Sequence, residues 1–552
     1  MIFRNSLLTL CIPLLIGLAA CNETDQAITL VQEIDELIPS AVNDTTPGLI
    51  IGVMQNGEII FQKGYGLANL NYDIPNSPEM VYNIGSVAKQ FLGYAFAMQH
   101  VEGTLNIDDP VSSYMENWPE FNEPVTIRHL LNHTSGYREA YTISNLAGRD
   151  IGIDRMDYEE AMEVVRRQPD LEFSPDSRYT YNSTAWVILA EIFEEATGEP
   201  AAVWVQKNIL EELDMESAQI ETYVGQVIEN AAESYSYSDE LGYTNEKSNR
   251  AIFGAADVYL NIPDAMKWIT NMKTAELGGQ DVLNLFLETN ELINGINTEY
   301  ALGIGVNEYR GLRRYRHTGG HAAFGTQLSY YPDQDLGIFI VSNFNRASVA
   351  SERIAELILG DQMDPELTYE NDRIALSEEF QVILPGRYIN EDRNQAISLR
   401  VEEEKLLVGE DTEMIQVAEN EFRISRSTDQ FEIETGFDGD ESARIILTGN
   451  NGIRTFTKTD SWEPAAPELN KYSGEYRSDE TDSIMRFSVD DNGTLEVQHR
   501  WIGTAPMEPL AEDIFRAGNN MMIEFIKDES GIITGFYANS GRTLNVWFQK
   551  EE

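Results

Sequence analysis

The sequence predicts an α+β domain followed by two antiparallel β modules, and three observations predict this order. Strand-like runs at 49–62 and 326–341 flank a long stretch, from about 155 to 300, with helical periodicity. Helical periodicity stops beyond Asp361, where a polar segment begins. Two similar β-rich segments follow it, so the chain is too long and too varied for one domain.

The first elements of the α+β domain carry clear local signals. Asn56-Gly57 separates the runs 49–54 and 58–62 and predicts a hairpin, because both residues tolerate positive φ. An amphipathic helix is expected before the hairpin, with its apolar residues between Ala27 and Ile38. After the hairpin, a turn of small residues from Tyr82 leads into an apolar helix that ends at Gly103.

The tail contains a repeat. Leu384–Tyr388 is similar to Tyr472–Tyr476, and Arg454–Lys458 is similar to Val546–Lys550. Asn-Gly turns separate short alternating runs between these ends, which predicts an antiparallel module present twice. We expect a linker at 363–380, one module at 381–460 and another at 461–552, forming either two small barrels or one barrel built from halves.

The charge balance excludes two classes of partner. The chain has 39 Lys and Arg against 92 Asp and Glu, a net charge of −53. Such a balance argues against nucleic acid and against electrostatic docking on anionic lipid. A hydrated acidic surface accounts for it, and we assign the charge no catalytic meaning.

The amino-terminal segment is predicted to be an export signal. Arg4 precedes an apolar run that ends in Leu18-Ala19-Ala20-Cys21 and resembles the lipobox of bacterial lipoproteins. The resemblance implies that 1–21 is a lipoprotein signal segment, that Cys21 is lipidated and that the protein is tethered to the cell envelope. The alternative is an ordinary signal peptide, but Cys11 and Cys21 are the only cysteines, so Cys21 has no other evident use. Asn22 favours the outer membrane, facing the periplasm.

Ser86 is the candidate nucleophile. It falls in the first turn of the predicted helix, where free N–H groups and the helix dipole favour negative charge. Lys89 lies three residues on, over the same helix face. A partly desolvated lysine can accept the serine proton. The alternative is that Ser86 caps the helix and Lys89 is a solvated first-turn residue.

Two further motifs carry candidate chemistry. Tyr181 lies on a loop of turn formers that leads into an apolar helix. His317 is followed by Thr318, Gly319 and Gly320 on a predicted strand, where the glycines permit close approach of another backbone or a ligand. Taken separately, Tyr181 is expected in half-buried packing and His317 bonded to a neighbouring strand.

His129 and His133 are four residues apart, which is a spacing that can bind a metal. The Glu of a His-Glu-x-x-His motif is missing and no third ligand is near. We therefore predict a structural role at a helix end and reject a zinc site.

The order Ser86-x-x-Lys89, Tyr181 and His317-Thr-Gly resembles the penicillin-recognising serine hydrolases. This family holds class C β-lactamases, D,D-carboxypeptidases, D-aminopeptidases and esterases, and the resemblance covers roughly 45–362 of a domain expected at 22–362. It implies a β-lactamase/transpeptidase-like fold, in which an antiparallel sheet from both ends of this segment is flanked by helices and faces a helical lobe. It also implies an active site in the cleft between them, with no cofactor and no metal.

The resemblance assigns the roles. Ser86 would attack a carbonyl, Lys89 and Tyr181 would share the proton transfers, and His317 would join this network or bind substrate. The backbone N–H groups of Ser86 and Gly320 would form the oxyanion hole.

Ser183, Thr318 and Gly319 would contact substrate. Two departures leave the leaving group open: Ser183 stands where relatives carry an amide side chain, and His317 stands where the Lys-Thr-Gly form carries lysine.

The sequence therefore predicts a serine hydrolase that forms an acyl-enzyme at Ser86 and cleaves a D-amino-acid peptide, amide or ester. The alternatives are a β-lactamase or carboxylesterase, and a catalytically inactive penicillin-binding-like scaffold. A catalytic domain followed by two β modules resembles D-aminopeptidases, where the modules border the cleft and restrict substrate size. Spacer modules, or modules that bind sugar or protein, are the alternative for the tail.

Overall fold

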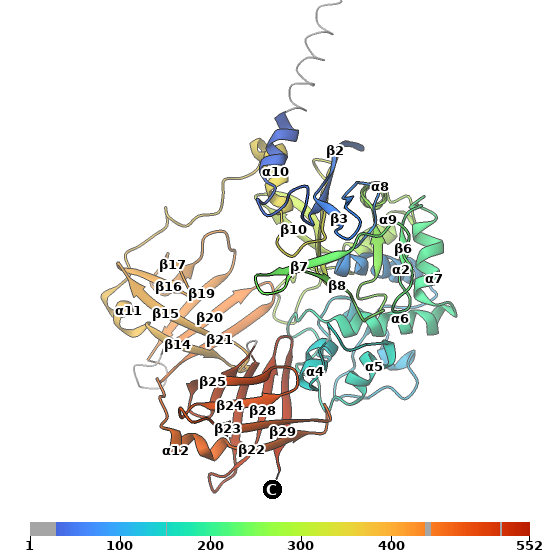
Figure 1. Ribbon diagram of the computed structural model, residues 1–552. Coiled ribbons are helices and arrows are strands. Elements are labelled where there is room, and N and C mark those ends of the chain that lie inside the picture. Colours follow the sequence, from blue (N-terminus) through green and yellow to red (C-terminus); the bar gives the residue numbers. More distant parts are fainter. Residues whose placement is uncertain (1–28, 151, 437–442, 519–520, 552) are drawn as a thin grey trace, which may run out of the picture.

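The computed structural model describes residues 29–150, 152–436, 443–518 and 521–551 (Figure 1). It consists of an α+β domain followed by two β-barrels, which confirms the predicted fold class. The predicted signal segment 1–21, including Cys21, lies outside the described residues.

One six-stranded antiparallel sheet organises the α+β domain. Its order is β10-β11-β12-β13-β1-β2, so the early hairpin joins the late strands. The strands are β1 (Leu49–Gln55), β2 (Glu58–Tyr65), β10 (Gly305–Tyr309), β11 (Leu312–His321), β12 (Phe324–Tyr331) and β13 (Leu336–Ser342). Strands β1 and β13 are apolar and buried throughout most of their length because helices cover both faces.

The helices on the two faces come from different parts of the chain. Helix α8 (Ile262–Thr274) packs against β1 and β13 on one face. Helix α10 (Ser351–Leu359) packs against β12 and β13, where Ile354 shares a core with Ile34 of the helical segment 29–36. The expected amino-terminal helix therefore covers the sheet.

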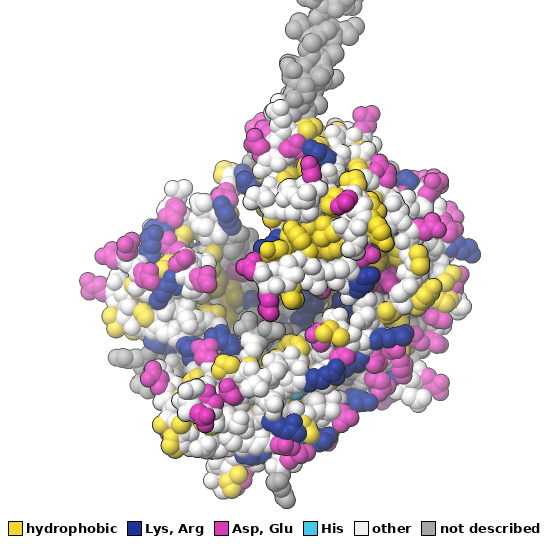
Figure 2. Space-filling view, viewed as in Figure 1, with side chains coloured by type: hydrophobic (Ala, Val, Ile, Leu, Met, Phe, Trp, Pro, Cys, Tyr) yellow, Lys and Arg dark blue, Asp and Glu magenta, His cyan; other side chains and the backbone are white. Residues whose placement is uncertain are grey.

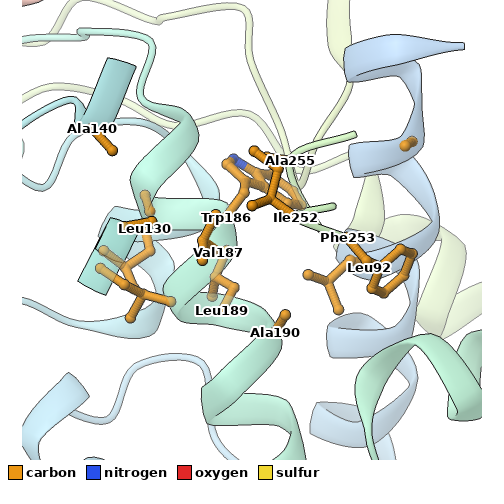
Figure 3. Close-up of a cluster of buried hydrophobic side chains, with 14 of the residues drawn as sticks. Leu92, Leu130, Ala140, Trp186, Val187, Leu189, Ala190, Ile252, Phe253 and Ala255 are labelled. Atoms are coloured by element: carbon orange, nitrogen blue, oxygen red, sulfur yellow. The ribbon is translucent and has the colours of Figure 1, made fainter. Parts of the chain in front are cut away.

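A helical lobe packs beside the sheet. Its helices are α2 (Lys89–Glu102), α3 (Ile127–Leu131), α4 (Ala140–Leu146), α5 (Tyr158–Arg166), α6 (Ser183–Thr197), α7 (Ala201–Val205) and α9 (Gly279–Phe286), with short helical turns η1 (Gly85–Ala88), η2 (Val111–Ser113) and η3 (Gln206–Leu210). The turn η4 (Gly360–Gln362) instead follows α10 beside the sheet. Figure 3 shows part of the lobe core, in which Trp186 and Val187 of α6 meet Leu92 of α2 and the segment 252–255. Helix α2 ends at Gly103, whose φ of 81° is left-handed, as expected for a C-cap.

Short strands complete the domain: β3 (Leu67–Asn69) pairs with β4 (Ile74–Pro75), β7 (Ser234–Ser238) pairs with β8 (Gly242–Glu246), and β9 (Val258–Leu260) lies between β5 (Tyr82–Asn83) and β6 (Gln219–Ile220). The β5–β9 pair holds the residues just before Ser86 against the lobe.

The tail forms two closed eight-stranded barrels, which decides between the two arrangements that the repeat allowed. The first contains β14 (Gly386–Asn390), β15 (Ala396–Glu402), β16 (Lys405–Val408), β17 (Thr412–Gln416), β18 (Glu421–Arg423), β19 (Gln430–Thr435), β20 (Ala443–Gly449) and β21 (Gly452–Thr459). The second contains β22 (Gly474–Ser478), β23 (Ser483–Val489), β24 (Leu495–His499), β25 (Gly503–Ala511), β26 (Ile514–Ala517), β27 (Met521–Lys527), β28 (Ile533–Ser540) and β29 (Thr543–Lys550). Closure pairs each of the described barrel strands with a neighbour on both sides.

The two barrels begin in the same way. Helix α11 (Glu378–Ile383) precedes the first barrel, and α12 (Ala466–Leu469) with η5 (Asn470–Tyr472) precedes the second. In each first strand a buried tyrosine donates its hydroxyl proton to the carbonyl oxygen four residues earlier, at 2.9 Å: Tyr388 to Leu384, and Tyr476 to Tyr472. The sequence repeat is thus a repeat of one structural unit.

The second barrel is fixed to the helical lobe by a buried ion cluster. Arg138, 3% exposed, contacts Glu172 at 3.0 Å and Glu480 of the barrel at 2.8 Å. Its guanidinium also donates to the carbonyl of Leu544, while the Leu544 N–H donates to Glu172 at 3.0 Å. Burial raises the pKa of Glu172 to about 7, although Arg138 and the Leu544 N–H stabilise its charge.

None of the helices within the described ranges has the length and apolar composition needed to span a membrane.

We predict that Arg138→Ala lowers the free energy of unfolding by about 3–5 kcal/mol, because it leaves two buried carboxylates without their cation. Arg516→Ala is the control, since Arg516 pairs with Glu508 on the exposed face of the same barrel. Arg516→Ala should lower the free energy of unfolding by only about 0–1 kcal/mol. Urea unfolding at pH 8 measures both, and equal losses would contradict the assigned role of the cluster.

Candidate active site

Ser86 lies in η1, a tight turn between β5 and α2. The turn begins at Gly85, whose φ of 53° is left-handed and whose N–H donates to the side chain of Asn83 at 2.9 Å. Lys89 then opens α2, so the serine and lysine of the Ser-x-x-Lys motif are joined by one turn of backbone.

Lys89 is fully buried and lies against the nucleophile. Its Nζ is 3.3 Å from Ser86 Oγ and 2.7 Å from the Ala255 carbonyl oxygen. Burial lowers the pKa of Lys89 to about 7, and Arg542 lowers it further, while Glu139 and Asp257 oppose the shift. The amine therefore loses its proton near neutral pH, where it can accept the proton of Ser86.

Tyr181 lies over the same pair. Lys89 Nζ is 5.1 Å from the centre of its ring. Burial raises the pKa of Tyr181 well above its ordinary value, although the nearby Ser86 hydroxyl opposes the rise. Within the described residues the Tyr181 hydroxyl forms no hydrogen bond of ordinary geometry. Tyr181 therefore stays protonated at physiological pH, and of the two candidate bases Lys89 is the one whose proton-accepting form is populated there.

The edge of β11 approaches the Ser86 turn very closely. A Cβ atom on Gly319 would lie 2.0 Å from the Ile84 carbonyl oxygen and 3.1 Å from Ser86 N. A Cβ atom on Gly85 would lie 2.7 Å from Gly320 N. Glycine is required at both positions, and the contact brings the backbone N–H groups of Ser86 and Gly320 into one region. Thr318, which is exposed, lies at the mouth of this region.

His317 belongs to a chain of neutral hydrogen bonds. Its Nδ1 lies 2.6 Å from the Thr318 carbonyl oxygen and its Nε2 lies 2.9 Å from the Tyr300 hydroxyl. Tyr300 is also 3.3 Å from His133 Nε2, and His133 Nδ1 accepts the Asn182 N–H at 3.0 Å. One set of tautomers satisfies every contact: His133 donates to Tyr300, Tyr300 donates to His317, and His317 donates to Thr318.

Both histidines are kept uncharged. Burial, together with the charge of Lys89, lowers the pKa of His317 to about 3. The same two causes lower the pKa of His133 well below its ordinary value. His317 therefore supplies no positive charge at the position where the Lys-Thr-Gly form of the motif carries lysine.

Ser183 is placed differently from Tyr181. It opens α6, is buried, and its N–H donates to Glu139 Oε2 at 2.7 Å. Asn182 caps the helix and donates from its side chain to the carbonyls of Tyr137 and Arg138. Neither of the two cavities that border Tyr181 is lined by Ser183.

These two cavities hold about 240 Å³ and 270 Å³ and share Tyr179, Tyr181 and Asn451. The second is lined by His317 and Thr318, whereas the first extends toward both barrels. A larger cavity of about 870 Å³, lined by Arg167 and Trp547, contains none of the catalytic candidates.

The sequence did not identify several residues of the site. His133 appears there only as a possible structural residue, yet it contacts the Tyr181 ring at 4.1 Å between ring centres. Tyr300, Glu139 and Arg542 carry no motif of their own, so no local pattern in the sequence identifies them.

His129 has the structural role expected for it. Its Nδ1 accepts the Thr126 N–H at 3.1 Å in a capping box of α3, and its Nε2 lies 3.1 Å from Asp176. Among the described residues, no group of three His, Cys, Asp or Glu is arranged to hold a metal ion.

Comparison with known proteins identifies the family of the chain. Residues 30–361 match the family model described as beta-lactamase. The chain belongs to the beta-lactamase family. Together with relatives named D-aminopeptidase, this membership supports a serine hydrolase.

A D-aminopeptidase of Brucella anthropi is 23% identical over 455 residues, which is 81% of this chain and 82% of that protein. A teichoic acid D-alanine hydrolase of Staphylococcus aureus is 25% identical, covering 43% of this chain and 57% of that protein.

Among solved structures, the octameric penicillin-binding protein homologue from Pyrococcus abyssi has a TM-score of 0.53 at 20% identity. It covers 78% of this chain and 99% of its own. FmtA from Staphylococcus aureus has a TM-score of 0.51 at 21% identity, covering 62% of this chain and 88% of its own. These two likenesses concern the fold.

We predict that labelling of Ser86 by a fluorophosphonate accelerates from pH 5 to pH 9, with a midpoint at about 7. Neutral Lys89 is the reactive form, and its lowered pKa means that the neutral form accumulates as the pH rises through that value. Intact-protein mass spectrometry at fixed times measures the rate.

Two variants test the assignment of this midpoint. Asp257 raises the pKa of Lys89, so Asp257→Asn should move the midpoint to lower pH. Glu172→Gln should leave the midpoint in place, although the pKa of Glu172 is also about 7. A midpoint that disappears in either variant would assign the titration to that carboxylate instead of Lys89.

Proposed function

We propose that the protein is an acyl-enzyme-forming hydrolase that cleaves an amide or ester bond after a D-amino acid with a free amino group. The alignments with two relatives named D-aminopeptidase span 82% and 92% of those proteins, which supports this substrate class. The observation that carries the proposal is a buried carboxylate, Glu139, beside the Ser86–Lys89 pair.

One carboxylate oxygen of Glu139 accepts no hydrogen bond from the described residues. Glu139 is 1% exposed, and its Oε2 accepts the Ser183 N–H, while its Oε1 has no hydrogen-bond partner among the described residues. Its charge acts on Lys89 and on Tyr181. Burial raises the pKa of Glu139, while the charges of Arg542 and Lys89 oppose the rise. A substrate ammonium would supply the missing donor and offset the cost of the buried charge.

Acylation and deacylation can then use the same residues. Neutral Lys89 takes the proton of Ser86 as Oγ attacks the carbonyl carbon, and the N–H groups of Ser86 and Gly320 receive the developing oxyanion. The proton passes to the leaving amine or alcohol with Tyr181 positioned between Lys89 and the cavity. Water then attacks the acyl-enzyme by the same route and releases the D-amino acid.

The β-lactamase alternative receives less support at this site. A β-lactam carries a permanent carboxylate, and the residue that would meet it on β11 is His317, which burial keeps neutral. Thr318 and Arg316 also line the cavity on this strand, and Arg316 is already paired with Glu352 at 3.5 Å. A carboxylesterase needs neither an ammonium nor a carboxylate on its substrate. The substrate series below separates it from the proposed activity.

We predict that D-alanine p-nitroanilide is hydrolysed and that Ser86→Ala abolishes the reaction. N-acetylation of the substrate should lower kcat/KM by about tenfold or more, because the acetamide cannot pair with the carboxylate of Glu139. The L-alanine compound gives the stereochemical preference. Release of p-nitroaniline measures all three.

Glu139→Gln is the matched variant, since it keeps the shape of the side chain and removes its charge. It should reduce the preference for the free amine more than it reduces turnover of the acetylated compound. Equal losses for both compounds would refute the role of Glu139. No turnover and no fluorophosphonate adduct would leave the non-catalytic scaffold.

We also propose that the protein is exported and held at the cell envelope by lipid on Cys21, as the lipobox resemblance suggests. Cys21→Ser should abolish incorporation of radiolabelled palmitate and move the protein from the detergent phase to the aqueous phase of Triton X-114. Cys11→Ser is the control and should leave both unchanged. Palmitate incorporation that survives Cys21→Ser would refute this proposal.

A further inference from the structure

A cavity of about 240 Å³ lies where the catalytic domain and both barrels meet. The catalytic domain lines it with Tyr179, Thr180 and Tyr181, the first barrel with Arg454 and the second with Arg542. Figure 2 shows the surface hollowed between the barrels and the α+β domain. The cavity is therefore next to the catalytic tyrosine but is built largely by the tail.

Most charges in this cavity are already paired. Arg178 contacts Asp392 at 2.6 Å, and Glu172 contacts Arg138 at 3.0 Å. Glu172 also accepts the Leu544 N–H. Neither carboxylate in the lining is therefore free to balance another cation.

Two guanidinium groups have no carboxylate at ion-pair distance among the described residues, although the charge of Arg542 acts on the buried Glu139. Arg454 donates to the amide oxygen of Gln395 at 3.0 Å, and its buried Nε has no partner among the described residues. Arg542 is exposed and lies 4.6 Å above the Tyr181 ring. Within the described ranges, no carboxylate oxygen lies within 4.0 Å of either group. The chain has 92 acidic residues against 39 basic ones, so two unpaired arginines in one cavity are unexpected.

The backbone holds Arg542 in place. The neighbouring Thr543 accepts the Glu139 N–H at 3.1 Å through its hydroxyl, and Leu544 is bonded on both sides to the Arg138–Glu172 pair. Arg542 therefore projects from a hairpin anchored to the lobe, and its position over Tyr181 does not depend on a flexible loop.

We propose that Arg542 and Arg454 bind a carboxylate on the leaving-group side of the substrate, so that the preferred substrate is a short peptide with a free carboxyl terminus. The inference rests on the proposed function, in which Glu139 receives the amino group. Paired guanidiniums match a carboxylate through charge-assisted hydrogen bonds. A zwitterionic dipeptide would then place its ammonium near Glu139, its scissile carbonyl at Ser86 and its carboxylate beyond Tyr181.

The test compares two substrates with the same scissile bond, D-alanyl-glycine and D-alanyl-glycinamide, which differ only in the carboxylate. The intact enzyme should show a kcat/KM about tenfold or more higher for the carboxylate form. Arg542→Gln and Arg454→Gln should each lower this ratio at least about threefold. The ratio cancels any effect that loss of Arg542 has on Tyr181 itself.

Arg516→Gln is the matched control, because it removes the same charge from the outside of the second barrel. The ratio of kcat/KM for D-alanyl-glycine to kcat/KM for D-alanyl-glycinamide should be the same in Arg516→Gln as in the unaltered protein. A ratio near one in the unaltered protein, or a ratio that neither Arg542→Gln nor Arg454→Gln changes, would overturn the proposal.

Binding separates this proposal from the proposed reaction. Isothermal titration calorimetry with Ser86→Ala compares the same two dipeptides without turnover. Tighter binding of D-alanyl-glycine that is lost in Ser86→Ala/Arg542→Gln supports the carboxylate site even if neither dipeptide is hydrolysed. Equal binding of the two dipeptides refutes the site even if D-alanine p-nitroanilide is cleaved.

Discussion

The contact between the glycine edge of β11 and the Ser86 turn is the constraint on which the site depends. The Ile84 carbonyl occupies the space where a side chain on Gly319 would begin. Only a bare backbone at this point lets the sheet and the helical lobe close on each other. Their closure buries Lys89 completely, and burial is the main cause of its lowered pKa.

Burial also explains why the site contains so many neutral polar groups. His133 and His317 are both held uncharged and are joined through Tyr300, so their ring nitrogens are satisfied without a cation. This arrangement keeps positive charge off His317, although the same strand carries three arginines outside the catalytic network. Glu139 is the exception, because one of its carboxylate oxygens remains unpaired.

The barrels contribute to the cleft through a docked hairpin. The buried Arg138 cluster joins the lobe to the second barrel and fixes Leu544 beside Glu172. Because Arg542 precedes these anchors by two residues, the tail reaches Tyr181 with a cation. A module that could have been a spacer therefore alters the electrostatic environment of the catalytic residues.

The sequence by itself determined what depends on neighbours in the chain: the Asn56-Gly57 hairpin, the Ser86–Lys89 spacing over one helical turn and the repeat of the β module. Only the tertiary structure decided that Tyr300 joins two histidines and that Arg542 covers Tyr181. These contacts join residues up to several hundred positions apart, and none has a local signature. Which charges remain unpaired depends on all neighbours at once, so it emerges only when the three domains are packed together.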